Sequence, residues 1–290
     1  MSSFISYLIS GISLGSVYAI IALGYTMVYG IAKMLNFAHG DVIMVGSYVV
    51  YVAVSGMGLN PILAILLSII ICTLMGVVIE GVAYRPLRNA ASPLAVLITA
   101  IGVSYLLLIW GADTKSFSNV ISLPSLKLAG GSIVITGVTI VTIIGGILIM
   151  AGLMLFISKT KTGQAMLAVS EDKGAAQLMG INVNKTISIT FAIGSGLAAI
   201  AGVLLCSAYP SLTPYTGAMP GIKAFVAAVF GGIGSIPGAF IGGVVLGILE
   251  IFGKAYISSQ MADAIVFGVL IVVLVVKPTG ILGKNIQEKV

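Results

Sequence analysis

Residues 42–79 read VIMVGSYVVYVAVSGMGLNPILAILLSIIICTLMGVVI and contain no charged side chain. A helix needs about 20 apolar residues to cross the hydrocarbon core of a bilayer, so this stretch is long enough for more than one crossing. The pair Asn60-Pro61 divides it, because proline suits the first turn of a helix and disrupts its interior. We therefore expect one membrane span to end before this pair and a second to begin at Pro61.

The rest of the chain has the same character. Apolar residues make up 59% of the 290 positions, charged residues make up 8%, and the mean hydropathy is +1.20. Soluble domains carry roughly 25% charged residues, so this chain cannot cover itself for water. Strands of a membrane barrel would alternate apolar and polar residues, which these runs do not. The composition therefore excludes a soluble enzyme and predicts an all-α, polytopic membrane bundle forming a single domain over 1–290.

Charges, prolines and glycines place the individual spans. The predicted spans are 5–30, 39–55, 61–83, 93–111, 136–157, 188–208 and 261–276, with a broken region at 222–252. Ten of the 14 basic residues fall in 31–38, 84–92, 158–187 and 277–290. The positive-inside rule then puts the N-terminus outside and the C-terminus in the cytoplasm, in the plasma or inner membrane.

That orientation constrains the broken region. Residues 222–252 must begin and end outside, as a hairpin, or the basic tail would lie on the wrong side. We expect two short or tilted helices, interrupted at 231–237 by Gly231-Gly232-Ile-Gly234-Ser235-Ile-Pro237. About eight or nine crossings follow, depending on how the hairpin is counted.

Motifs for catalysis and energy conversion are missing from the sequence. The nearest match to a phosphate-binding loop, 247–255, has the wrong glycine spacing and an alanine in place of the Mg²⁺-binding hydroxyl. A single histidine and two separate cysteines give no metal-ligand pattern, and the scattered charges give no nucleic-acid footprint. We thus predict no enzyme, no cofactor and no nucleic-acid partner. An ion-coupled carrier would need acidic groups in mid-span, whereas Asp41, Glu80 and Glu250 are predicted near span ends.

The cytoplasmic loop 158–187 carries a predicted helix at 170–180. Ser170 would be its N-cap, Glu171 and Asp172 would occupy its first turn, and Gly180 would end it. Four residues would form a small apolar face: Ala175, Ala176, Leu178 and Met179. An isolated helix of this length is marginal, so it must dock on something, either another protein or the lipid surface.

Several segments resemble one known family. AVSEDKGAAQLMGIN at 168–182 resembles the coupling-helix region of branched-chain amino acid ABC importer permeases, the LivH/LivM family. Further resemblances to this family, closer to LivH than to LivM, follow in order: NFAHGD at 36–41, YRPLR at 84–88, GGIGSIPGA at 231–239 and PTGILG at 278–283.

The resemblance implies a transport function and a set of partners. Such permeases pair with a second permease, LivM-like here, and two cytoplasmic ABC ATPases dock on their coupling helices and use ATP and Mg²⁺. An extracytoplasmic binding protein delivers leucine, isoleucine or valine. The alternatives are the same family with urea, short amides or other amino acids as cargo, or an ion-coupled carrier or channel.

Two groups are candidates for the transport pathway. Asn36 and His39 are predicted near the cytoplasmic end of a span. They either line the exit of the transport pathway or form hydrogen bonds that stabilise a chain reversal. The glycine motif, with Gly231, Gly232, Gly234, Ser235 and Pro237, either lines the pathway or lets helices approach closely.

Overall fold

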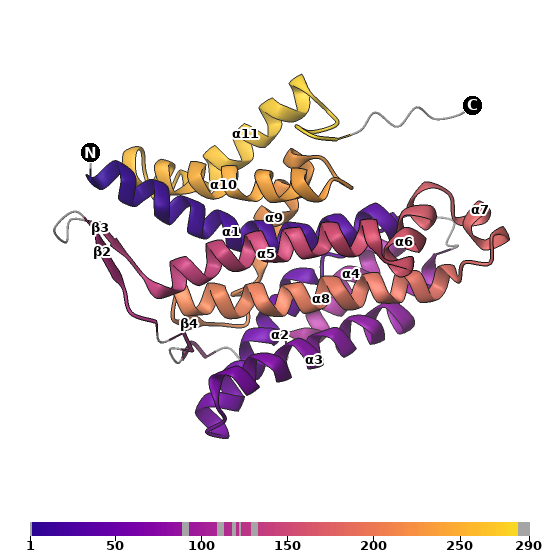
Figure 1. The fold of residues 1–290 in the computed structure, drawn as a ribbon, viewed down its shortest axis with the longest axis horizontal. Coiled ribbons are helices and arrows are strands. Elements are labelled where there is room, and N and C mark those ends of the chain that lie inside the picture. Colours follow the sequence, from indigo (N-terminus) through magenta and orange to yellow (C-terminus); the bar gives the residue numbers. More distant parts are fainter. Residues whose placement is uncertain are drawn as a thin grey trace.

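The computed structural model describes residues 2–88, 93–108, 113–117, 120–121, 123–128 and 133–283. Helices make up most of this part of the chain, and several of them run along the long axis of the molecule (Figure 1). Four short strands form two antiparallel pairs near one end. The expectation of an all-α membrane protein is therefore confirmed.

The helices follow one another in a simple order. Their bounds are α1 Ser2–Ala32, α2 His39–Tyr51, α3 Pro61–Ile79, α4 Pro93–Leu107, α5 Gly137–Lys159, α6 Lys161–Glu171, α7 Lys173–Leu178, α8 Val183–Ala208, α9 Ala218–Gly231, α10 Ile236–Tyr256 and α11 Ala262–Val276. π-Helical turns at Val52–Gly56 and Glu80–Tyr84 prolong α2 and α3, and a 3₁₀ turn follows at Arg85–Leu87. Strand β1 Lys115–Ser116 pairs with β4 Ser211–Leu212, and β2 Leu126–Leu128 pairs with β3 Ile133–Ile135.

The predicted spans coincide with helices. By length and composition, five described helices could cross a membrane: 3–32, 61–87, 137–159, 183–208 and 236–256. The predicted break at Asn60-Pro61 is confirmed, because the Asn60 side chain accepts a hydrogen bond from the Ile62 N–H and Pro61 opens α3. The last residues of the span predicted at 93–111 lie outside the described part of the chain.

The hairpin predicted at 222–252 is partly wrong. The chain does break there, between the end of α9 at Gly231 and the start of α10 at Ile236. However, only α9 is short. Helix α10 has 21 residues and is long enough to cross a membrane, because it continues past residue 252 to Tyr256.

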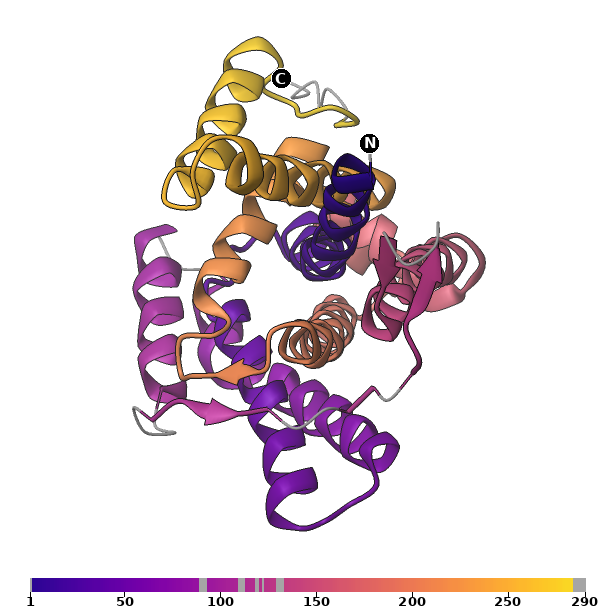
Figure 2. The same cartoon turned by 90° about the vertical axis from the view of Figure 1, so that its left-hand side faces the viewer.

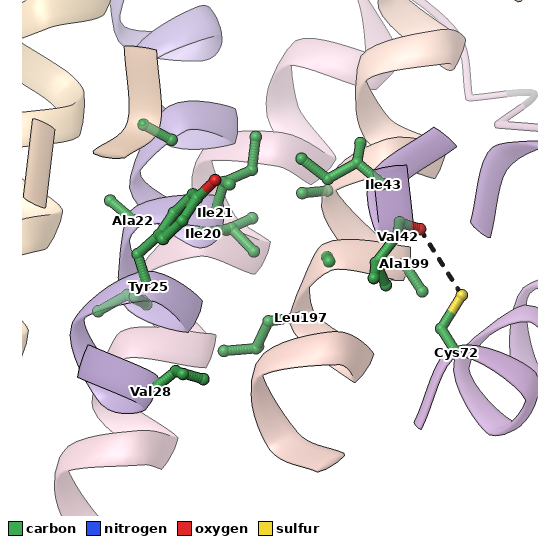
Figure 3. Packing of buried hydrophobic residues seen from close by; sticks show 14 of the residues in the cluster. Ile20, Ile21, Ala22, Tyr25, Val28, Val42, Ile43, Cys72, Leu197 and Ala199 are labelled. Carbon is green, nitrogen blue, oxygen red and sulfur yellow. Dashed lines mark hydrogen bonds between the residues drawn. The ribbon is translucent and has the colours of Figure 1, made fainter. Parts of the chain in front are cut away.

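Helix α1 lies at the centre of the bundle, packed against α5, α8, α9 and α10. In Figure 2, which looks along the long axis, α1, α5 and α8 are seen nearly end-on. Figure 3 shows part of the core, where Ile21 and Tyr25 of α1 lie near Ile43 of α2. On the far side of α2, the Cys72 Sγ of α3 lies 3.8 Å from the Val42 carbonyl oxygen.

Small residues bring α1 and α10 into close contact. A methyl group added to Gly11 would lie 2.8 Å from the Ile248 Cα, and one added to Gly15 would lie 2.6 Å from the Val244 Cα. These distances are shorter than any real contact of a β-carbon, so a larger side chain would force the helices apart. The close contact of α1 with α10 therefore depends on these two glycines.

The molecule has two distinct ends (Figure 1). We call the end with the N-terminus and strands β2 and β3 the hairpin end, and the opposite one, with α6 and α7, the α7 end. Three of the predicted basic loops, 31–38, 84–92 and 158–187, meet at the α7 end. There Lys173 donates to the Ala32 carbonyl oxygen at 3.0 Å, and Arg88 contacts Asn184. The loops predicted to share one side of the membrane therefore lie together.

Candidate functional site

The loop at the α7 end is built by two helix caps. Thr160 ends α5 and begins α6, where its hydroxyl accepts a hydrogen bond from the Gly163 N–H at 3.0 Å. Asp172 separates α6 from α7, and its Oδ1 accepts from the N–H groups of Gly174 and Ala175 at 2.7 and 2.9 Å. A side-chain oxygen in this position satisfies N–H groups that the first turn leaves free.

The single helix predicted at 170–180 is therefore wrong. Ser170 and Glu171 end α6, and the Ser170 hydroxyl donates to the Leu167 carbonyl oxygen instead of capping a new helix. Asp172 is the N-cap, and α7 has only six residues. The prediction failed because residues 161–169 read as loop, although Gly163, Met166 and Val169 form a buried face at helical spacing.

The end of α7 was predicted correctly. Gly180 has a φ of +81°, a left-handed conformation that favours glycine. The Gly180 N–H donates to the Gln177 carbonyl oxygen, and the Ile181 N–H donates to that of Ala176, both at 3.0 Å. This pair of bonds is the Schellman arrangement of a helix C-terminus.

The apolar face predicted for α7 is divided in the structure. Ala176 is only 4% exposed because it packs into its own chain, so it is not free to contact another protein. Leu178 and Met179 are 90% and 82% exposed at the tip of the loop, and Ala175 is also exposed. The surface available for docking is thus the tip, with Glu171 and Asp172 beside it.

A basic pocket lies behind α7. It has a volume of about 710 Å³ and lies between the end of α3, α7 and the start of α8. Arg85, Arg88, Lys173, Gln177, Asn182 and Asn184 supply its polar lining. Burial lowers the pKa of Lys173, and the nearby charges of Arg88 and Lys33 lower it further.

Asn36 and His39 lie inside the bundle. The Asn36 Oδ1 accepts a hydrogen bond from the Tyr84 hydroxyl at 2.9 Å, and both side chains are buried. His39 is 1% exposed and lies against Tyr25, with ring centroids 4.5 Å apart. Among the described residues its Nε2 has no hydrogen-bond partner.

The predicted position of His39 needs correction. It does begin a helix, but this beginning is not at the α7 end. A methyl group added to Gly24 of α1 would lie 2.8 Å from the His39 Nε2 and 3.2 Å from the carbonyl oxygen of Gly194, midway along α8. The segment after α1 turns back into the bundle before α2 starts, which no local feature of the sequence predicted.

Two helices begin side by side at this depth. A methyl group added to Gly40, in the first turn of α2, would lie 2.8 Å from the carbonyl oxygen of Gly217, the residue before α9. One added to Gly221 in α9 would lie 2.9 Å from the Gly40 Cα. Helices that start inside a bundle are typical of transporters, where their free N–H groups face a substrate path.

The glycine motif forms a tight turn at the α7 end. Gly231 and Gly232 are buried, Gly232 has a φ of +104° and Gly234 a φ of +90°. Ser235 caps α10 by accepting from the Gly238 N–H at 3.2 Å, and Pro237 lies in the first turn.

The C-terminal motif closes this turn. The Ile281 and Leu282 N–H groups donate to the carbonyl oxygens of Phe230 and Gly231, both at 2.9 Å. We call residues 280–283 the clasp. The sequence presented the two glycine motifs as separate features, whereas the structure makes each the packing partner of the other. It does not bring the turn into contact with His39.

A buried ionic network crosses the other half of the bundle. Glu250 of α10 is 1% exposed and accepts from the Tyr18 hydroxyl of α1 at 2.8 Å. It also pairs with Lys223 of α9 at 2.9 Å and with Lys254 at 2.6 Å. Lys223 in turn pairs with Asp263 of α11 at 2.6 Å. Glu250 lies six residues before the end of α10 at Tyr256, which agrees with the prediction that it lies near the end of a span.

One feature of the sequence could have indicated this network. Lys223 is the only charged residue between Lys185 and Glu250, and a lone charge in such a run needs a partner. The two cations and two carboxylates balance, so the network ties four helices together without surplus charge.

A cavity of about 600 Å³ at the hairpin end is lined by α1, α5 and α8, with hydroxyls from Ser10, Ser13 and Thr136. Within the described ranges no cluster of three or more His, Cys, Asp or Glu is placed to hold a metal.

Comparisons with known proteins indicate one family. The family described as "Branched-chain amino acid transport system / permease component" matches residues 7–275. The high-affinity branched-chain amino acid transport system permease proteins BraD of Pseudomonas aeruginosa and LivH of Escherichia coli are each 45% identical to this chain, covering 99% of it and 98% of their own lengths. A probable branched-chain amino acid transport permease protein LivH of Methanocaldococcus jannaschii is 31% identical, over 91% of this chain and 88% of its own.

Proposed function

This chain belongs to the family of permease components of branched-chain amino acid transport systems, and from that premise we propose that it carries leucine, isoleucine and valine into the cell. The observation that carries the proposal is the match to this family over residues 7–275, nearly the whole chain. Energy comes from partner ATPases, since the sequence has no nucleotide-binding loop of its own.

The tip of α7 is the proposed contact with an ATPase. Leu178 and Met179 together expose an apolar surface at the end of a well-capped loop, and exposed apolar side chains of this size are typical of protein contacts. ATP binding would draw the loops of two paired permeases together and rotate the permease halves. In this arrangement the α7 end faces the cytoplasm, the N-terminus lies outside, and the chain makes eight or nine crossings.

The proposed pathway passes the point where α2 and α9 begin. Both helices present their N-terminal N–H groups inside the bundle, and such groups favour a carboxylate. His39 and Asn36 support this junction from within. The second permease, LivM-like, would complete the pathway, and an extracytoplasmic binding protein would deliver the cargo.

Transport by the reconstituted complex tests the proposal. The chain would be expressed with the second permease, ATPases and binding protein encoded beside it, and uptake of labelled leucine, valine, urea and acetamide would be compared. We expect ATP-dependent uptake of the two amino acids. Uptake of urea or acetamide instead would change the cargo, and uptake without any ATPase would refute the ABC assignment.

The docking surface has its own test. The double substitution Leu178→Ser with Met179→Ser should lower co-purification of the ATPase about tenfold or more, because apolar anchors dominate such contacts. Leu167→Ser is the matched control, since Leu167 is half-exposed on the neighbouring α6. Equal loss in the control, or no loss in the double variant, would remove the docking assignment from the tip.

A further inference from the structure

The basic pocket behind α7 holds more positive charge than its own residues neutralise. Arg85 and Arg88 both pair with Glu80, whose side chain is fully buried. Lys173 and Lys33 add two further cations nearby, and no ion pair joins either of them to a carboxylate among the described residues. Asp172, next in sequence to Lys173, is already engaged by the first N–H groups of α7.

The Lys223–Glu250 network differs from this pocket in its balance of positive and negative charges. In that network Lys223 and Glu250 are buried, and the cations and carboxylates balance. The pocket behind α7 is lined by three cations, Arg85, Arg88 and Lys173, with Lys33 nearby, and the single carboxylate of Glu80 opposes them. Only the Arg88 side chain is largely buried, whereas Arg85, Lys173 and Lys33 are exposed. Like charges gathered around one concave site raise its positive potential, and this favours binding of an anion from outside.

Hydrogen-bond donors in the pocket are free to meet such an anion. The ammonium of Lys173 has three N–H groups, and the structure gives it one acceptor, the Ala32 carbonyl oxygen. Arg88 is 11% exposed, and its buried Nε has no acceptor among the described residues. The first N–H groups of α8, at Val183 and Asn184, also border the pocket, and helix N-termini favour anions.

From these observations we propose that the pocket formed by Arg85, Arg88, Lys173 and the start of α8 binds a phosphate group, in the cell the headgroup phosphate of an anionic lipid. A volume of about 710 Å³ accommodates a glycerophosphate headgroup, and Ile181, Val183 and Ile187 provide an apolar wall for the glycerol carbons. Basic pockets at the cytoplasmic ends of membrane helices recognise such lipids. The choice of lipid rests on the proposed function, which places the α7 end at the cytoplasmic membrane surface.

Occupation of the pocket would affect the α7 loop. Lys173 is the first residue of α7, whereas Arg88 follows the end of α3, so an anion between them joins the loop to the bundle. The anionic lipid would thereby hold the loop in place for the ATPase. This role is separate from the contact made by Leu178 and Met179.

Binding to the purified full-length chain tests the proposal. Thermal unfolding in detergent would be followed while phosphatidylglycerol, phosphatidylcholine or inorganic phosphate is added. Phosphatidylglycerol should raise the melting temperature, because a ligand that binds only the folded state stabilises it. Phosphatidylcholine should not, because its own choline neutralises the phosphate. Stabilisation by inorganic phosphate alone would support a phosphate site supplied from solution.

Variants locate the binding. Lys173→Gln should weaken phosphatidylglycerol binding about tenfold, the loss of one charge-assisted contact. Lys161→Gln, an exposed lysine at the same end on α6, is the matched control and should bind as the unmodified chain does. Gln177→Glu should also abolish binding by placing a carboxylate in the pocket, and it decides the matter if Lys173→Gln does not fold.

Two results would overturn the proposal. One is the absence of stabilisation by both phosphatidylglycerol and inorganic phosphate, which would leave the surplus charge to an acidic side chain of a docked protein. The other is undiminished binding by both Lys173→Gln and Gln177→Glu. Because binding is measured without transport, either result is distinguishable from a failure of the proposed cargo or of the ATPase partnership.

Discussion

Removing one charge from the Lys223–Glu250 network should destabilise the whole bundle. Both side chains are at least nine-tenths buried, and their charged atoms are 2.9 Å apart. Lys223→Met would leave Glu250 and Asp263 with only Lys254, and Glu250→Gln would leave two lysines with only Asp263. Breaking a buried pair in this way costs about 3–5 kcal/mol, so we expect either variant to lower the unfolding free energy by that amount.

The double variant gives the stricter test. Lys223→Met combined with Glu250→Gln leaves one cation, Lys254, and one carboxylate, Asp263, so neutrality is restored. Its loss of stability should be about 2 kcal/mol smaller than the sum of the two single losses. Unfolding would be followed by circular dichroism in detergent with increasing denaturant.

A surface pair in the same chain serves as the control. Lys115 and Asp113 are 3.4 Å apart, with side chains 39% and 86% exposed. Such pairs contribute about 0–1 kcal/mol, so Lys115→Met should have little effect on the unfolding free energy. Strictly additive losses in the double variant, or single losses no larger than that of Lys115→Met, would refute the idea of a shared buried network.

Three further predictions concern close packing, the α7 cap and orientation. Gly15→Ala should lower the unfolding free energy by about 1–3 kcal/mol, because its methyl group meets the α10 backbone. Gly145→Ala, whose methyl group would face open space, should change this free energy little. Equal effects of the two substitutions in denaturant unfolding would contradict the α1–α10 contact. Gly180→Val should reduce leucine uptake, because a β-branched residue at a φ of +81° costs about 1 kcal/mol or more and misdirects the chain into α8; unchanged uptake would show that the cap is dispensable. A cysteine at Ser259 should react with an impermeant thiol reagent added to intact cells and one at Ser158 should not, and the opposite pattern would reverse the orientation.

The sequence was sufficient to predict most of the helices. Long charge-free runs end at prolines and charges, and the Asn60-Pro61 break and the start of α4 at Pro93 are local features that act within one turn. The left-handed glycine at 180 was equally local. Such features can be read from neighbouring residues without any knowledge of the fold.

The remaining features depend on contacts between distant residues. Whether Ala176 faces a partner or its own chain is decided by how α7 packs on α8, and no periodicity can be measured over six residues. The depth of His39 depends on a chain reversal fitted between Gly24 and Gly194. Pairing of Lys223 with Glu250 joins residues on different helices, so only the isolation of each charge was visible in the sequence.

The clasp at 280–283 also sets an order of events during synthesis. The ribosome completes the turn at 231–235 about fifty residues before it adds the segment that hydrogen-bonds to Phe230 and Gly231. During this interval α10 and α11 must enter the membrane while the Gly231 carbonyl oxygen lacks its hydrogen-bond donor, the Leu282 N–H. The glycine turn therefore acquires these two hydrogen bonds only after α11 has been synthesised, so the end of α9 is fixed by a segment that is made later than α10 and α11.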